Sequence, residues 1–220
     1  NQIESYKDTD EDQWSVYGLG LPAKNNELVY TSYEFWNSED ELYEVDSEGK
    51  KHPKFEDVIL GADWGWNHPS AIIKAWVDTN RQRVWVKELI HESYLTTDDL
   101  IKKMLDLKID KEMRMFGDSA EPKTIESIKR AGFDISDSIK DVKPGIDCVK
   151  SYKLYIHSNS IKIQEELKRY KWKMRGEVKT DEPIKLFDDA LCALRYALYT
   201  YTQKIKRSND YDFDFEVLDL

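Results

Sequence analysis

The fold is decided by residues 58–63, which read Val-Ile-Leu-Gly-Ala-Asp, a short apolar run that ends in a carboxylate. A run of this kind predicts a strand buried in the middle of a sheet. Residues 113–117 predict a second strand, which ends in the same way at Asp118. Because α/β sheets bind ligands at the carboxyl ends of their strands, we expect Asp63 and Asp118 to converge if these two strands are neighbours.

The rest of the chain alternates between strand-like and helix-like patterns. Residues 71–77 and 83–90 predict two strands joined by a turn. Further elements follow from apolar periodicity and from helix start and stop residues. They are short strands at 28–35 and 155–157, and helices at 96–107 (capped by Thr97 or Asp98), 122–132, 161–172 and 185–204.

This order of elements predicts an α/β fold, a single domain with a mixed sheet flanked by helices. We place the domain at residues 53–205. Residues 1–52 are polar and turn-rich and are expected to form an arm or linker. Residues 206–220 are acidic and are expected to form a tail.

The predicted meeting of carboxylates points to metal chemistry. Two carboxylates held a few ångström apart repel each other unless protons or cations lie between them. Two Mg²⁺ or Mn²⁺ ions suit such a gap, because they prefer oxygen ligands and act as a pair in phosphodiester hydrolysis. A third carboxylate is expected from Asp189, which shares a helix face with Cys192. Asp188 is as compatible with helix capping as with metal binding.

The net charge of −10 argues against an ordinary nucleic-acid-binding module. It favours a site that uses acidic groups to hold metal, or a piece that other subunits deliver to DNA. A basic stretch at residues 168–175 is interleaved with Tyr170 and Trp172. This stretch is compatible with nucleic-acid binding, but we favour core aromatics beside a solvated face.

Cysteines and apolar runs exclude other classes. Cys148 and Cys192 form no C-x-x-C arrangement, so neither a zinc site nor a disulfide framework is predicted. No apolar run approaches the roughly 20 residues that span a bilayer. We therefore expect no contact with a membrane.

Three separated motifs resemble the nuclease domain of tailed-phage terminase large subunits, a member of the RNase H-like superfamily. The motifs are residues 61–70, 117–123 and 188–197, and the resemblance covers about residues 12–203 in consistent order. It implies an RNase H-like fold and a divalent-metal endonuclease that cuts concatemeric double-stranded DNA during viral genome packaging. Asp63 and Asp118 match the first two metal-binding acids of the family.

The third motif departs from the family pattern. In many relatives it reads Asp-His-x-x-Asp-Ala-Leu-Arg-Tyr, which places His at Asp189 and the third acid at Cys192. A thiol favours softer metals and replaces a hard carboxylate poorly. Either Asp189 serves as the third ligand or the site is weakened, and we favour Asp189.

The same resemblance suggests residues around the metals. Lys123, Lys140 and Lys143 are expected to contact DNA phosphates, with a solvated loop as the alternative for the last two. His68 is a candidate general acid or base, and Arg195 is expected to pair with a carboxylate and orient the site. Further outer partners are Glu88 and Glu121, unless they are simple surface residues.

The large subunits of this family also carry an ATPase motor with a phosphate-binding loop. The pair Gly49-Lys50 is followed by Lys51 and has Glu44 where the first glycine of that loop belongs, so the motif is absent. We expect the nuclease half alone, linked through residues 1–52 to a missing ATPase domain. Expected partners are the portal protein and the small terminase subunit, on the procapsid in the host cell cytoplasm.

Two other functions remain open. The first is a resolvase-like or transposase-like nuclease of the same fold, which would prefer branched or end-specific DNA. The second is an inactive docking domain that binds the portal or small subunit, with Cys192 marking a lost metal site.

Overall fold

A seven-stranded mixed sheet forms the centre of the computed structural model, in the order β1-β9-β6-β5-β4-β7-β8. The structure describes residues 2–5, 7, 14–21, 27–176 and 178–216, and the side chains of the last helix up to residue 206. The strands of the sheet are β1 (Glu34–Trp36), β4 (Asp57–Asp63), β5 (Ser70–Asp78), β6 (Arg83–Glu92), β7 (Met115–Gly117), β8 (Ile135–Asp137) and β9 (Lys153–His157).

Within this sheet β5 is the strand that runs opposite to the others. It pairs antiparallel with β4 and β6, while β4, β7 and β8 are parallel to one another, as are β6, β9 and β1. The predicted hairpin and the predicted mixed sheet are therefore confirmed. The predicted central strand, β4, lies between β5 and β7.

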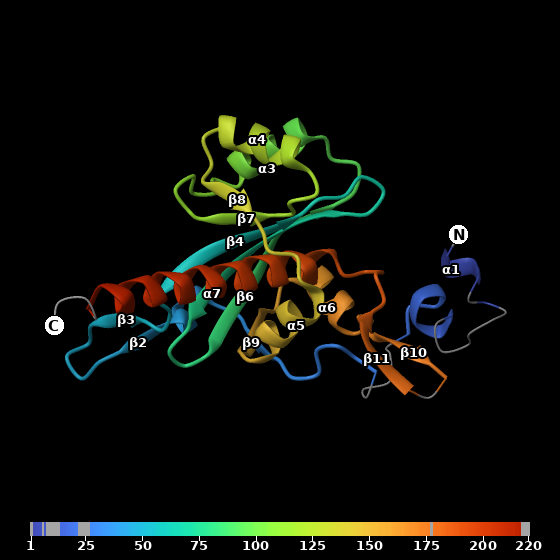
Figure 1. Cartoon of the computed structure of the whole chain (residues 1–220), viewed down its shortest axis with the longest axis horizontal. Helices are drawn as coiled ribbons and strands as arrows, with labels where there is room; N and C mark the ends of the chain where they lie inside the picture. The colour runs from blue at the N-terminus through green and yellow to red at the C-terminus, as the bar shows by residue number, and fades with distance from the viewer. Residues whose placement is uncertain (1, 6, 8–13, 22–26, 177, 217–220) are drawn as a thin grey trace.

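Helices cover both faces of the sheet. On one face lie α5 (Val142–Lys150), α6 (Ile161–Leu167) and the long α7 (Asp189–Glu216), and on the other lie α3 (Thr97–Asp106) and α4 (Pro122–Arg130). Figure 1 shows α7 running along the sheet, with α3 and α4 above it and α5 and α6 below. No helix among the described residues is long and apolar enough to cross a membrane.

The alternation of side chains on β4 decides which face the site occupies. Leu60 and Ala62 pack with α3 and α4, whereas Ile59 packs with α7. Gly61 lies against α7, because a Cβ built on it would come within 2.1 Å of the Ala193 carbonyl oxygen. Since successive side chains of a strand point to opposite faces, Asp63 lies on the α7 side.

Several smaller elements flank the sheet. They are α1 (Gln2–Ser5), η1 (Trp14–Gly18), η2 (Glu39–Leu42), the hairpin of β2 (Tyr43–Val45) and β3 (Lys51–Pro53), and the hairpin of β10 (Trp172–Arg175) and β11 (Val178–Pro183). Trp36 and Leu42 are buried together with Trp76 and Trp85. Part of the segment that the sequence assigns to an arm therefore packs against the domain.

The helix predicted at 161–172 was too long. It ends at Leu167, and Trp172 begins β10 instead. Tyr170 and Trp172 are buried in the core, and the Lys171 ammonium is buried at 3.4 Å from a carboxylate oxygen of Glu27. The stretch 168–175 therefore does not form a continuous cationic surface, because Tyr170, Lys171 and Trp172 are buried.

Other boundaries shifted by a few residues. The cap of α3 is Thr96, whose hydroxyl accepts the backbone N–H of Asp99 while the Asp99 carboxylate accepts the Thr96 N–H. This reciprocal capping makes Thr96 the cap, one residue before the earlier of the two predicted caps, Thr97 and Asp98. The predicted last helix begins at Asp189 and not at 185, and β8 was not predicted.

We predict that Gly61→Ala lowers the free energy of unfolding by about 1–3 kcal/mol, because the added methyl group overpacks the contact between β4 and α7. Urea denaturation followed by circular dichroism measures the change. Lys102→Ala is the control, since this side chain is exposed on α3 and surface substitutions usually change stability little. Equal stability of Gly61→Ala and the parent chain would contradict the proposed close packing.

Candidate functional site

Asp63 and Asp118 lie side by side at the carboxyl ends of two neighbouring parallel strands. Ala62 of β4 is in register with Gly117 of β7, and the Asp118 N–H donates to the Ala62 carbonyl at 3.0 Å. Phe116 packs in the cluster on the α7 face, so Asp118, two residues on, belongs to the same side. The convergence that the sequence predicts is therefore present in the fold.

The electrostatics of Asp63 reflect this crowding. Burial, reinforced by the negative charges of Asp118, Asp189 and Asp188, raises the pKa of Asp63 to about 8. A carboxyl group in this position resists ionisation because nearby negative charge outweighs the opposing effect of Arg195. The site thus carries surplus negative charge that a cation would neutralise.

Asp118 is held from three directions. Its Oδ1 atom lies 2.5 Å from the Lys140 ammonium and accepts the Ala120 N–H at 2.8 Å. Its carbonyl oxygen accepts the indole N–H of Trp64 at 3.0 Å. Lys140 precedes α5, so the loop between β8 and α5 brings a cation into the acidic site.

The start of α7 supplies two more carboxyl groups. Asp188, directly before the helix, accepts the thiol of Cys192 at 3.4 Å through its Oδ2 atom. Burial raises the pKa of Asp188 to about 6. The pKa of Asp189 is also raised, by burial and by the charge of Asp188. Of the two, Asp189 affects Asp63 more strongly, and Asp188 is turned toward Cys192.

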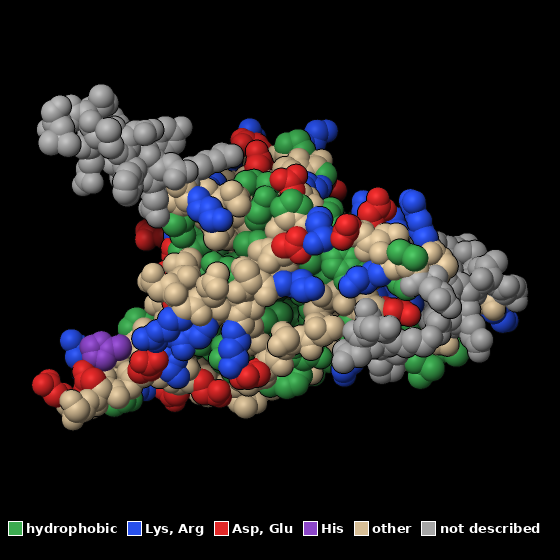
Figure 2. Space-filling view, turned by 60° about the horizontal axis from the view of Figure 1, so that its bottom comes forward, with side chains coloured by type: hydrophobic (Ala, Val, Ile, Leu, Met, Phe, Trp, Pro, Cys, Tyr) green, Lys and Arg blue, Asp and Glu red, His purple; other side chains and the backbone are tan. Residues whose placement is uncertain are grey.

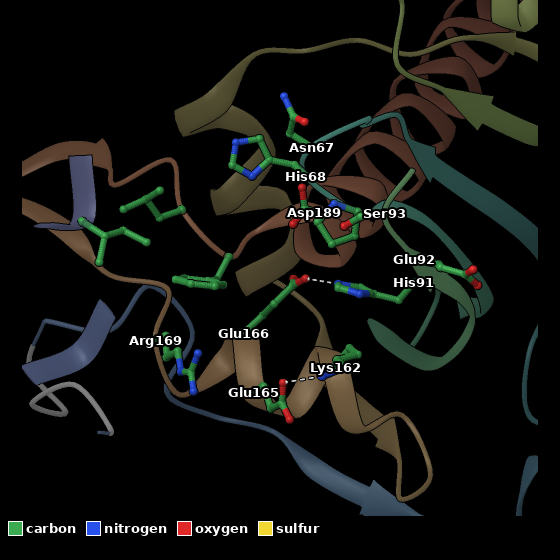
Figure 3. Close-up of a pocket in the computed structure, with 14 residues that line it drawn as sticks. Asn67, His68, His91, Glu92, Ser93, Lys162, Glu165, Glu166, Arg169 and Asp189 are labelled. Atoms are coloured by element: carbon green, nitrogen blue, oxygen red, sulfur yellow. Dashed lines mark hydrogen bonds and ion pairs between the residues drawn. The ribbon is translucent and has the colours of Figure 1, made fainter. Parts of the chain in front are cut away.

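A cavity of about 850 Å³ opens beside Asp189. It is lined by Ile3, Asn67, His68, Pro69, His91, Glu92, Ser93, Lys162, Glu165, Glu166, Arg169, Leu186, Phe187 and Asp189. Figure 3 shows the side chains of His91 and Glu166 directed toward each other in its wall, with Asp189 beside them. The acidic site therefore continues into an open hollow that is lined by both polar and apolar residues.

Arg195 is a buried residue of α7 that contacts the loop carrying Lys140. Its Nη1 atom donates to the carbonyls of Lys140 at 3.0 Å and Asp141 at 3.3 Å, and its Nη2 atom contacts the Cys192 sulfur at 3.5 Å. The expected pairing with a carboxylate was wrong. The guanidinium instead holds the Lys140 loop by its backbone, because that loop crosses α7 at this residue.

The remaining predicted residues are more dispersed. His68 lines the cavity and its charge acts on both Asp188 and Asp189. Lys143 pairs with Asp147 at 2.7 Å, and exposed Lys123 lies in the first turn of α4. The two glutamates make hydrogen bonds within the domain. The Glu121 carboxylate accepts the Thr124 hydroxyl at 2.9 Å, and the Glu88 carboxylate accepts the Ile163 N–H at 3.0 Å.

Sequence reasoning missed His91 and Glu166. Among the described residues, these two and Asp189 form a group whose ligand atoms all lie within 4.8 Å of one another. Glu166 Oε1 already accepts from His91 and from the Ala190 N–H, and its Oε2 accepts from the Leu191 N–H. We therefore interpret His91 and Glu166 as hydrogen-bonded support for the site and not as a metal cage.

The residues present fit a divalent-metal site. Asp63, Asp118 and Asp189 offer hard carboxylate oxygens, which are the ligands that Mg²⁺ and Mn²⁺ prefer. Burial and the neighbouring acids raise the pKa of Asp63 in spite of the opposing charge of Arg195, so a cation bound there would favour the ionised carboxylate. Cys192 is buried, burial raises the pKa of its thiol, and the thiol donates to the Asp188 carboxylate.

The wider surface matches the acidic composition. On the face shown in Figure 2, Lys and Arg side chains lie next to Asp and Glu side chains across the surface. Charges of both signs are therefore interspersed on this face. Attraction of a polyanion there depends on local lysines and not on the overall field.

The fold and the family agree with this geometry. The domain is an RNase H-like fold, and the family model described as "Terminase RNAseH like domain" matches residues 63–200. The chain belongs to this family of terminase RNase H-like domains. The predicted fold class and the predicted family are both confirmed.

Solved structures show the same fold. The nuclease domain of the large terminase g2p from bacteriophage SPP1, with bound Mn, is 14% identical, with a TM-score of 0.64 over 80% of this chain and 99% of that one. The P22 large terminase nuclease domain is 20% identical, with a TM-score of 0.57 over 69% of this chain and 84% of that one.

A larger relative extends beyond this chain. The large terminase from a thermophilic bacteriophage, in complex with ATP-gamma-S, is 19% identical with a TM-score of 0.59. The match covers 77% of this chain but 44% of that one. A comparison with curated proteins found no match.

We predict that Asp63→Asn stabilises the metal-free domain by about 1–3 kcal/mol, because the folded state no longer confines a carboxylate among other acids. The amide keeps the acceptor for the Trp64 N–H. Thermal denaturation with and without Mn²⁺ measures the effect, and the variant should also lose the stabilisation that Mn²⁺ gives the parent chain. Asp134→Asn, an exposed change just before the amino-terminal end of β8, is the control. A less stable Asp63→Asn would contradict the crowding.

Proposed function

We propose that this domain is a divalent-metal-dependent endonuclease of a viral genome-packaging terminase, which hydrolyses phosphodiester bonds of concatemeric double-stranded DNA. The observation that carries the proposal is the convergence of Asp63 and Asp118 at adjacent strand ends, beside the start of α7. Family membership places this acidic site in a terminase domain. The manganese bound to the SPP1 nuclease domain supports a divalent cation as the cofactor.

Each acid has a distinct role in this proposal. Asp63 lies between the other acids and would contact both of two Mg²⁺ or Mn²⁺ ions, while Asp118 and Asp189 would each hold one. Bound there, the ions would activate a water and neutralise charge on the leaving oxygen of the phosphodiester. Asp188 remains the alternative for the third ligand, although its carboxylate is engaged with Cys192.

Lys140 links the acidic site to the DNA. Without a metal ion its ammonium neutralises Asp118 at 2.5 Å. When cations occupy the acids, the ammonium becomes available for a phosphate oxygen, and Arg195 keeps its loop in place. Lys123 and Lys143 would add phosphate contacts farther along the duplex, and His68 would face the substrate from the cavity wall.

The domain is proposed to act within a larger assembly. The large terminase of the thermophilic bacteriophage, of which the match covers 44%, was solved with a nucleotide analogue, which supports a partner ATPase domain in the same full-length chain. The portal protein and the small terminase subunit are the further proposed partners, on the procapsid in the host cell cytoplasm. A docking domain without catalysis is the outcome if the assays below show neither metal binding nor cleavage.

We predict that the purified chain nicks supercoiled plasmid in the presence of Mn²⁺, and that Asp63→Asn and Asp118→Asn each lower the rate at least about 100-fold, because each removes a direct metal ligand. Agarose gels of the time course measure the nicked fraction. Asp134→Asn should cut like the parent chain. No nicking by the parent chain, or equal nicking by Asp63→Asn, would overturn the proposal.

The third ligand can be tested separately. We predict that Asp189→Asn lowers the nicking rate by about 10–100-fold or more, whereas Cys192→Ser changes it less than about threefold, because the thiol is not a ligand. The same gel assay, repeated over a series of Mn²⁺ concentrations, measures both. A Cys192→Ser enzyme as impaired as Asp189→Asn would assign the third position to residue 192.

A further inference from the structure

Glu166 is a buried carboxylate that caps a helix other than its own. It lies in the last turn of α6 and is 3% exposed. Its Oε1 atom accepts the Ala190 N–H at 3.1 Å, and its Oε2 atom accepts the Leu191 N–H at 2.9 Å. These N–H groups belong to the first turn of α7, where a helix leaves its donors without internal partners. The negative charge also lies at the positive end of the helix dipole.

His91, on β6, connects the Glu166 side chain to the sheet by a hydrogen bond. Its Nε2 atom lies 2.8 Å from Glu166 Oε1, and both side chains are nearly enclosed. From the same strand, β6, the Glu88 carboxylate accepts the Ile163 N–H in the first turn of α6. The helix that carries Glu166 is thus bound to β6 at both of its ends, so the cap has little freedom to move.

The cap has a consequence for the acids at the start of α7. An Asp at a helix start ordinarily uses its carboxylate to accept the free N–H groups of the first turn. Here Glu166 accepts them instead. Asp188 is therefore free to contact Cys192, and Asp189 is free to face the cavity (Figure 3).

We propose that Glu166, held by His91, is a positioning residue that fixes the first turn of α7 so that Asp189 presents its carboxylate to the metal site. This inference rests on the proposed function for the role of Asp189. Glu166 itself touches neither metal nor DNA, because its oxygens are already occupied by three donors. It acts through the backbone of Ala190 and Leu191.

The test compares Glu166→Gln with Glu126→Gln in the 220-residue chain. Gln keeps the shape but replaces one acceptor oxygen with a donor group, which cannot accept an N–H. We expect faster amide hydrogen exchange at Ala190 and Leu191 and a Mn²⁺ dissociation constant raised about 10–100-fold, measured by calorimetry. Glu126, an exposed residue of α4 paired with Arg130 on the other face of the sheet, should change neither value.

A double-mutant cycle separates positioning from general stability. If Glu166 acts through Asp189, then Asp189→Asn together with Glu166→Gln should weaken Mn²⁺ binding no more than Asp189→Asn alone. Additive losses, or unchanged Mn²⁺ affinity in Glu166→Gln, would overturn the inference. Should Glu166→Gln fail to fold, His91→Gln in the same assays keeps the test, with a smaller loss of affinity expected and an unchanged affinity counting against it.

The two proposals fail in different ways. If the parent chain binds no Mn²⁺, the proposed function and the metal role of the cap are both wrong, whatever the exchange data show. If the parent chain binds Mn²⁺ and loses that binding in Asp189→Asn but not in Glu166→Gln, the proposed function stands and the positioning role is wrong.

Discussion

The mutual repulsion of carboxyl groups at the ends of β4 and β7 is the constraint on which the rest of the site depends. The sheet brings Asp63 and Asp118 together by register, and close packing of α7 over Gly61 adds the acids at the helix start. The protein tolerates this arrangement because a large core on both faces of the sheet holds the strands and the helix in place. A site whose carboxyl groups repel one another in this way is suited to binding cations.

The support for the site comes from residues that are remote in sequence. Arg195 holds the backbone of the loop that carries Lys140, while Glu166 and His91 hold the first turn of α7. Arg195 and Glu166 act on backbone groups, so neither of them occupies the metal-site carboxylates or the Lys140 ammonium. This division between residues that position and residues that bind explains why the site can be both crowded and ordered.

The sequence predicted the parts of this arrangement that depend on local pattern. Apolar runs ending at Asp63 and Asp118 predict the strands, and α/β sheets bind ligands at strand ends. That the two strands are neighbours was a condition of the predicted convergence, and the structure supplies it. The burial of Lys171 against Glu27 and the cap from Glu166 have no local signature, because each joins segments that are far apart in the chain. The same holds for Arg195, whose partners are backbone carbonyls that no residue pattern marks.

The most direct test of the account is a crystal structure of this chain grown or soaked with Mn²⁺, with the ions located by their anomalous scattering. The account predicts ions bound between the carboxylates of Asp63, Asp118 and Asp189, with the Lys140 ammonium moved away from Asp118. Ions absent from this group at a saturating Mn²⁺ concentration, or bound elsewhere while Lys140 still pairs with Asp118, would contradict it.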